Sequence, residues 1–232
     1  MEDLKTSETW RVFRIISELV EGFENLNELG PAVSIFGSSR MKPGDRYYED
    51  AIALARLLAD DGFAIITGGG PGIMEGANRG AKEGMSHSVG LNIEIPSEQT
   101  PNQYQDIGLS FRYFFIRKLM FMKYAISFII FPGGFGTMDE MFEALTLVQT
   151  KRIKSFPVIL YGADYWDGLL KWMKTTLVPA GTISKEDFAL FSIVDSPGEV
   201  RFLINEHFRV FGEEILPASR LQRMRKKGPE DR

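Results

Sequence analysis

Short apolar runs alternate with longer segments of helical periodicity over most of this chain. The runs are strand-sized and rich in β-branched and aromatic side chains, as expected of strands covered on both faces. They predict strands at residues 32–36, 63–67, 88–95, 125–131 and 157–161, with a short apolar piece at 107–111 and an edge strand at 188–194. Amphipathic segments predict helices at 47–60, 75–84, 115–124, 166–175 and 197–208. A further helix is predicted from the glycine-rich stretch at 133–136 to about residue 150. This alternation predicts an α/β fold, a single doubly wound Rossmann-like domain with a parallel central sheet.

An extra amphipathic helix is predicted before the first strand, ending near Gly30. Its apolar residues recur at three- and four-residue spacing and are Trp10, Phe13, Ile16, Val20 and Phe23. This stripe is typical either of a helix packed on the domain or of a lid or oligomer contact, and we favour the packed helix. The chain then divides into an N-terminal helix at 1–30, the Rossmann-like domain at 31–210, and a charged, flexible tail at 211–232.

Glycine- or serine-rich turns follow three of the predicted strands. They are Gly37-Ser38-Ser39, the turn from Gly68 to Gly72, and the turn from Gly133 to Gly136. Ligands of doubly wound sheets bind outside the carboxyl ends of the strands, near the point where strand order reverses. Because three such turns would meet at one edge of the sheet, we expect the binding site there.

The third turn lies between a buried strand and a helix. Bare backbone N–H groups and the positive end of the helix make such a turn suitable for a phosphate group. Thr137 and Glu140 also fit a capping box, in which Thr137 caps the helix and Glu140 reaches back to its N–H. The spacing favours this structural interpretation and a chemical role for Glu140 equally. The helix end predicts a lowered pKa for Glu140, and hence a base or a stabiliser of positive charge.

A cluster of cationic residues lies upstream of the strand before the third turn and consists of Arg112, Arg117 and Lys118. Such a cluster is typical of a solvated helix face, but it could also clamp a phosphorylated substrate, because Arg binds phosphate with two hydrogen bonds. The aromatic surroundings from Phe111 to Phe115 indicate a half-buried position and strengthen the second interpretation.

Composition excludes several classes of protein. The chain has no cysteine and two histidines, which excludes disulfides, thiolate catalysis and a histidine-rich metal site. The net charge of −4 argues against nucleic-acid binding. Neither a signal peptide nor a run long enough to cross a membrane is evident, so we expect a cytoplasmic protein without a membrane partner.

The motifs of other nucleotide-binding proteins are missing. No glycine turn matches G-x-G-x-x-G, and none is followed by Gly-Lys-Ser or Gly-Lys-Thr. The turns therefore do not predict a nicotinamide dehydrogenase or a Walker-type NTPase. The two glycine turns are suited to monophosphates instead.

The segment Pro132-Gly133-Gly134-Phe135-Gly136-Thr137-Met138-Asp139-Glu140, with Arg117-Lys118 upstream and the turn from Gly68 to Met74 earlier, resembles the LOG (Lonely guy) family. These proteins are cytokinin riboside 5′-monophosphate phosphoribohydrolases and bacterial relatives, often mislabelled lysine decarboxylases. The P-G-G-x-G-T-x-x-E motif is matched in full, and the resemblance covers about residues 32–200.

The resemblance implies that the domain at 31–210 is a nucleotide-binding catalytic domain. It implies hydrolysis of the N-glycosidic bond of a nucleoside 5′-monophosphate, giving a free base and ribose 5-phosphate. Arg117 and Glu140 match the catalytic pair. The expected substrate-binding residues are Ser38, Gly68, Gly69, Gly70, Gly72, Glu98, Lys118, Gly133, Gly134, Phe135, Gly136, Thr137, Asp139 and Thr146.

The resemblance also implies a homodimer with its site near the subunit interface, and neither a metal nor a cofactor. The alternative is a non-catalytic carrier of a phosphorylated cofactor, similar to molybdenum-cofactor carriers of the same superfamily. Lysine decarboxylation with pyridoxal phosphate is disfavoured, because the Schiff-base lysine of such enzymes usually follows a histidine. His87 and His207 are followed by Ser88 and Phe208.

Overall fold

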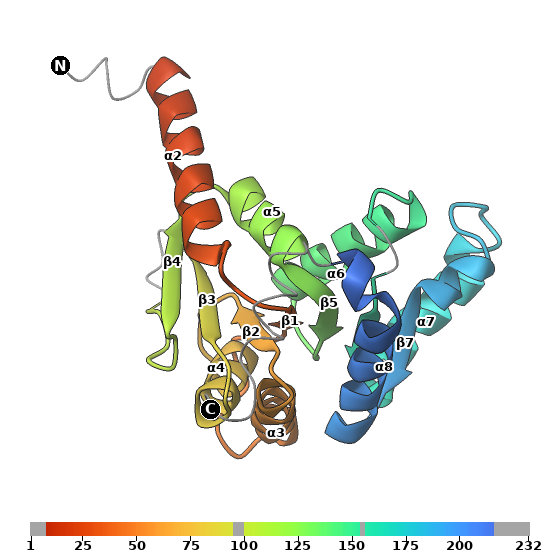
Figure 1. Ribbon diagram of the computed structural model, residues 1–232. Helices are drawn as coiled ribbons and strands as arrows, with labels where there is room; N and C mark the ends of the chain where they lie inside the picture. Colours follow the sequence, from red (N-terminus) through yellow and green to blue (C-terminus); the bar gives the residue numbers. More distant parts are fainter. Residues whose placement is uncertain (1–7, 95–99, 154–155, 216–232) are drawn as a thin grey trace.

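The structure, a computed structural model, describes residues 8–94, 100–153 and 156–215. Its centre is a seven-stranded sheet in the order β4-β3-β2-β1-β5-β6-β7, with every neighbouring pair parallel (Figure 1). The strands are β1 (Ala32–Phe36), β2 (Ala64–Thr67), β3 (Ser88–Ile93), β4 (Ile107–Phe111), β5 (Ala125–Ile130), β6 (Val158–Tyr161) and β7 (Phe191–Val194). The predicted doubly wound α/β fold is confirmed.

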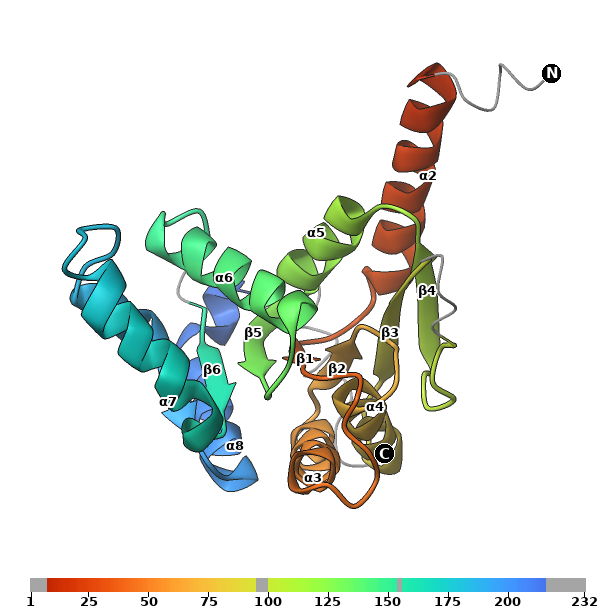
Figure 2. The ribbon, with the colours of Figure 1, turned by 180° about the vertical axis from the view of Figure 1, so that it is seen from behind.

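Helices cover both faces of the sheet (Figures 1 and 2). They are α2 (Glu8–Leu26), α3 (Arg46–Asp60), α4 (Ile73–Glu83), α5 (Phe114–Tyr124), α6 (Phe135–Gln149), α7 (Ala163–Trp172) and α8 (Pro197–Ile215). Alternate strand residues face opposite layers. Val33 and Ile35 of β1 pack with α3, α4 and α8, whereas Ala32 and Phe36 pack with α5, α6 and α7. Strands buried on both faces explain the continuous apolar runs in the sequence.

Several elements differ in extent from the prediction. A 3₁₀ turn (Glu186–Leu190) occupies the first part of the predicted edge strand, and a π-helical turn (Met173–Leu177) continues α7. α8 extends to Ile215, past the predicted end at 208. No helix of residues 8–94, 100–153 and 156–215 combines the length and the apolar character that a membrane span requires.

The N-terminal helix is present and packs on the domain, as favoured, but not through the apolar stripe that the sequence singled out. The stripe from Trp10 to Phe23 faces outward and is exposed. A second stripe packs inward instead, formed by Ile15, Leu19, Gly22 and Leu26. Gly22 explains this choice, because a Cβ at this position would lie 2.8 Å from the sulfur and methyl group of Met120 on α5. The glycine allows close helix contact on this side.

α2 is attached to both ends of α5. The carboxylate of Glu18 accepts hydrogen bonds from the N–H groups of Arg112 (3.2 Å) and Tyr113 (3.3 Å), just before α5 begins. A negative charge is favourable at this end of a helix. At the other end, the Tyr124 hydroxyl donates to Phe23 O at 3.4 Å. The N-terminal helix therefore supports the helix that carries Arg117 and Lys118.

Candidate active site

The three predicted turns lie side by side at the carboxyl edge of the sheet. They follow β1, β2 and β5, which are neighbours in the order β2-β1-β5. Backbone hydrogen bonds join them directly: Ser38 N–H donates to Pro132 O (2.9 Å), and Ile73 N–H donates to Ser38 O (3.0 Å). The turns thus surround the point where strand order reverses, the usual ligand site of this fold.

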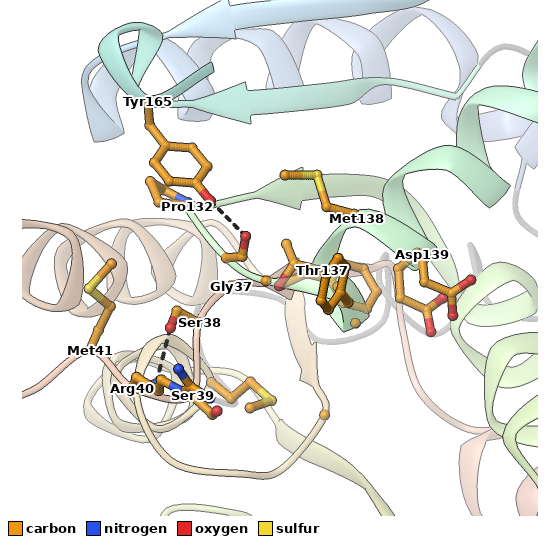
Figure 3. Close-up of a pocket in the computed structure, with 18 of the residues that line it drawn as sticks. Gly37, Ser38, Ser39, Arg40, Met41, Pro132, Thr137, Met138, Asp139 and Tyr165 are labelled. Atoms are coloured by element: carbon orange, nitrogen blue, oxygen red, sulfur yellow. Dashed lines mark hydrogen bonds between the residues drawn. The ribbon is translucent and has the colours of Figure 1, made fainter. Parts of the chain in front are cut away.

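A cavity of about 740 Å³ lies between these turns. This volume is typical of small-molecule sites. Figure 3 shows Ser38 and Arg40 on one side of the cavity and Thr137 and Asp139 on another. The lining residues are 36–41, 68, 74, 114, 117, 132–140 and 165.

The turn between β5 and α6 brings the N-terminus of a helix into this cavity. α6 begins at Phe135 after the extended residue Gly134, and no side chain caps its first turn. The N–H of Met138 donates to Gly134 O at 3.0 Å. The N–H groups before Met138 precede the helical ladder and have no acceptor within the helix. With the positive helix end, they form a site suited to phosphate.

The predicted capping box is wrong. Because α6 begins at Phe135, Thr137 lies inside its first turn and not at the cap. Glu140 Oε2 is buried and has no hydrogen-bond partner among the residues that the structure describes. The glycines allow the helix to begin within the turn itself, which leaves its N-terminus available to a ligand.

Glu140 projects from α6 and is only 7% exposed. Its Oε1 lies 3.3 Å from Nζ of Lys118. Burial raises the pKa of Glu140, and Lys118 and Arg117 only partly oppose this effect. The predicted lowering of this pKa is therefore wrong, since the cost of desolvation outweighs the favourable charges nearby.

Lys118 lies among three carboxylates. Its Nζ is 2.9 Å from Asp139, 3.3 Å from Glu140 and 2.6 Å from Glu143. Burial lowers the pKa of this lysine, but the hydrogen bonds to Asp139 and Glu143 raise it overall. Lys118 does not line the cavity. In this structure it holds the acidic side chains of α6 and does not contact the cavity where substrate was predicted to bind.

Arg117 reaches the cavity from α5 and is fixed on several sides. Its Nε donates to Leu91 O at 2.8 Å, and its Cζ lies 5.3 Å from the ring centroid of Phe121. A Cβ at Gly68 would collide with its guanidinium, so the glycine of the second turn makes room for this side chain. Burial lowers the pKa of Arg117, and the charge of Glu140 opposes that shift. Arg117 and Glu140 thus lie in one cavity and influence each other electrostatically.

The second turn is held by amide side chains from the loop before β4. Gly69 O accepts hydrogen bonds from Asn102 N–H (2.8 Å), Asn102 Nδ2 (3.1 Å) and Gln105 Nε2 (2.8 Å). Asn102 Nδ2 also donates to Gly70 O (3.0 Å) and to Asn78 Oδ1 (2.9 Å). This turn is consequently fixed by the protein's own side chains.

The predicted site residues fall into three groups. Those lining the cavity are Ser38, Gly68, Arg117, Gly133, Gly134, Phe135, Gly136, Thr137, Asp139 and Glu140. Those outside the lining are Gly69, Gly70, Gly72, Lys118 and Thr146, the last of which is exposed and donates to Phe142 O at 2.7 Å. Glu98 lies outside the described residues.

Sequence reasoning did not identify Arg40 and Tyr165 as site residues. Arg40 belongs to the first turn, and Tyr165 on α7 donates to Gly133 O at 2.7 Å. The sequence around Tyr165 gives no motif that would indicate this role. Its contact depends on how β6 and α7 pack beside β5.

Comparison with known proteins identifies the family to which this chain belongs. A family described as "possible lysine decarboxylase" matches residues 74–203, more than half of the chain. A probable cytokinin riboside 5′-monophosphate phosphoribohydrolase of Oryza sativa subsp. japonica is 31% identical over 148 residues, 61% of this chain and 58% of that protein. The chain belongs to the LOG family. It spans less than two thirds of the length of this relative.

Other relatives agree on the family and on the fold. A second probable cytokinin riboside 5′-monophosphate phosphoribohydrolase of the same organism is 28% identical over 180 residues, covering 75% of this chain and 76% of that protein. Nucleotide phosphoribohydrolase activity is thus supported for LOG proteins at the level of the family. The molybdenum cofactor binding protein from Rippkaea orientalis has a TM-score of 0.57 at 24% identity, over 76% of this chain and 96% of that chain. That likeness concerns the fold alone.

Proposed function

We propose that this protein hydrolyses the N-glycosidic bond of a nucleoside 5′-monophosphate, AMP or an N6-modified AMP of the cytokinin riboside type. The products are the free base and ribose 5-phosphate. One observation carries the proposal: a buried carboxylate with an unpartnered oxygen, Glu140, lines the same cavity as an uncapped helix N-terminus.

The substrate phosphate binds at the turn from Gly133 to Thr137, where the N–H groups of α6 have no helical acceptor. Arg117 and Arg40 are the two cationic residues in the lining and offset the phosphate charge. Fixing the phosphate holds the ribose over Glu140 on the same helix. Binding energy from this remote group lowers the barrier by positioning the reacting atoms.

Hydrolysis then proceeds through a ribose with oxocarbenium character. The bond between C1′ and the base nitrogen breaks, and the base leaves with the electron pair and takes up a proton from solvent. Water adds to C1′ and gives a proton to Glu140, which returns it to solvent. A carboxyl whose pKa is raised by burial is better suited to accept this proton. Its negative charge also stabilises the developing cation.

Lys118 is a positioning residue in this mechanism. It holds Glu140 on one oxygen and leaves the other for water. We further propose that the protein acts as a homodimer, as the resemblance to the family implies.

The test is release of free base from a panel of nucleoside 5′-monophosphates, including AMP and N6-substituted AMP. We expect Glu140→Gln to lower kcat by roughly 10²-fold or more with KM nearly unchanged. Glu143→Gln is the matched control, since Glu143 contacts the same lysine but does not line the cavity, and it retains most activity. Wild-type protein that releases no base from any member of the panel would overturn the proposal.

A non-catalytic carrier is the alternative function. It predicts a phosphorylated ligand that copurifies intact, and equal retention of that ligand by wild-type and Glu140→Gln protein. The buried, unpartnered carboxylate favours hydrolysis over this alternative. Schiff-base chemistry has less support, because the cavity lining within the described residues includes no lysine.

A further inference from the structure

Three consecutive carbonyl groups lead into α6, and each of them accepts a hydrogen bond. Pro132 O and Gly134 O accept from backbone N–H groups at 2.9 and 3.0 Å. Between them, Gly133 O accepts the hydroxyl of Tyr165 at 2.7 Å, the bond drawn beside Tyr165 in Figure 3. A backbone site for phosphate presents N–H groups to the ligand, so its carbonyl oxygens must be engaged elsewhere.

The middle one of these carbonyl groups is the least restrained by the backbone. It belongs to the peptide between Gly133 and Gly134, and glycine adopts many backbone conformations at little cost. Gly134 is extended, and open space surrounds the position that a Cβ would occupy there. The two flanking carbonyls are bonded to the main chain, whereas the middle one is bonded to a side chain. Tyr165 is therefore the donor that a substitution can remove.

Rotation of this peptide would change the donors that the turn presents. In a planar trans peptide the C=O and N–H groups point in opposite directions, so the bond to Gly133 O also fixes the direction of the Gly134 N–H. Gly133 lies four residues before Thr137, the spacing of a helical hydrogen bond. Within the described part of the chain Thr137 N–H does not make that bond, because Gly133 O is turned to Tyr165. Without the hydroxyl, Gly133 O can turn to α6 and engage this N–H, which removes a donor from the phosphate site.

Tyr165 reaches the turn from a fixed helix end. Its neighbour Trp166 is fully buried and donates its indole N–H to Tyr161 O at 3.0 Å. The rings of Tyr165 and Trp166 meet edge to face, with centroids 4.9 Å apart. At the start of α7, the N–H of Ala163 donates to Asp195 at 2.8 Å. The beginning of α7 is thus attached to the ends of β6 and β7, and it holds the phenol against the turn.

We propose that Tyr165 is a positioning residue that keeps the turn from Gly133 to Thr137 in its anion-binding conformation. Its one hydroxyl hydrogen is given to Gly133 O, so it has none left to donate to phosphate and acts through the turn. This inference rests on the proposed function in taking the turn as the phosphate site. Tyr165 is 43% exposed, and water can replace part of its bond. Loss of the hydroxyl therefore weakens phosphate binding severalfold and does not abolish it.

The test compares Tyr165→Phe with wild-type protein in the binding of ribose 5-phosphate, inorganic phosphate and adenosine, measured by calorimetry. Phenylalanine keeps the ring beside Trp166 and removes the hydroxyl alone. We expect the Kd of the two phosphate ligands to rise about 3- to 10-fold, the usual effect of one lost hydrogen bond. The Kd of adenosine, which carries no phosphate, should change by less than about 2-fold. A general structural defect would instead weaken all three ligands.

Tyr47→Phe is the matched control. The Tyr47 hydroxyl donates to Asp164 on the same turn of α7 at 2.8 Å, but Tyr47 does not line the cavity. This variant also loses one phenol hydroxyl beside α7, and it should bind all three ligands as wild type does. Unchanged phosphate binding in Tyr165→Phe would overturn the proposal. So would equal losses in Tyr165→Phe and Tyr47→Phe.

A second measurement follows the turn itself, with no ligand present. In amide NMR spectra, Tyr165→Phe should shift the N–H signals of Gly134 and Thr137 more than those of any residue outside α7. Exchange of the Thr137 N–H with solvent should slow severalfold, because this group gains Gly133 O as its acceptor. Unchanged signals and exchange at both residues contradict the proposed rotation.

Base release separates this inference from the hydrolase proposal. In an active enzyme, Tyr165→Phe should raise KM for a nucleoside 5′-monophosphate by the same factor as the Kd of ribose 5-phosphate and keep kcat within about 2-fold. Base release with unchanged KM in Tyr165→Phe overturns the role of Tyr165 alone. Wild-type protein that binds ribose 5-phosphate through a Tyr165-dependent turn but releases no base overturns the hydrolase proposal and supports the role of Tyr165.

Discussion

The turns after β2 and β5 are both rich in glycine, but the protein uses them differently. The turn after β2 is fixed by side chains of its own chain: Asn102 and Gln105 donate to Gly69 O, and Gly72 packs against the first turn. The turn after β5 has an uncapped helix N-terminus beside an unpartnered carboxylate oxygen. One turn is therefore a support for Arg117, and the other is the turn at which we propose that a ligand binds.

The difference shows why glycine content alone does not identify a phosphate site. Gly72 has φ +71° and is pressed against Ser38 and Ser39, so its role is close packing of two turns. Gly134 has φ −89°, with open space where a Cβ would lie. A glycine needed for packing and a glycine left open to a ligand look the same in a motif.

Substitution of these two glycines should separate the two roles most clearly. Gly72→Ala is expected to lower the free energy of unfolding by about 3 kcal/mol, because alanine is strained at this φ and its Cβ collides with the backbone of the first turn. Gly134→Ala should change it by less than about 0.5 kcal/mol. Urea denaturation measures both. Similar losses for the two variants would mean that the turns do not differ as described.

Asn102→Ala tests how firmly the second turn is fixed. The variant leaves the carbonyls of Gly69 and Gly70 and the side chain of Asn78 without this amide donor. We expect a loss of about 1–3 kcal/mol in unfolding free energy, together with a severalfold fall in kcat/KM as Arg117 loses its support. Asn25→Ala is the control, because its amide makes one exposed bond to Glu21 O, and it should be nearly neutral. Unchanged stability in Asn102→Ala would show that the amides do not hold the turn.

The smallest expected effect concerns pH and tests the turn after β5. In the proposed mechanism Glu140 must be ionised, so kcat/KM should rise with pH through the pKa of this group, which burial raises above 4.5. Lys118 opposes that shift, and Lys118→Met should therefore move the acid limb of the profile to higher pH. Lys123→Met, on an exposed position of the same helix, should leave the limb in place. Rates of base release between about pH 4 and 8 measure it. A limb that stays fixed or moves to lower pH in Lys118→Met contradicts the assignment.

The sequence by itself determined the order of the elements and the position of the three turns. Strand and helix periodicity and glycine turns are local signals, so β1, β5 and the helix at 46–60 appear close to their predicted places. The parallel connections then required these turns to meet at one sheet edge. The sequence predicted sixteen site residues, fourteen for substrate binding and two for catalysis. Ten of these sixteen line one cavity for this reason.

Tertiary structure alone decided which surfaces and charges are buried. α2 has two apolar stripes, and the close fit of Gly22 against Met120 favours the one that packs inward. The pKa of Glu140 rises because neighbouring elements exclude water, which the local helix end could not predict. Asn102 reaches Gly69 across a long stretch of sequence, and Lys118 meets three carboxylates of another helix. Burial and contacts between distant segments depend on packing, and packing has no signature within a single segment of the chain.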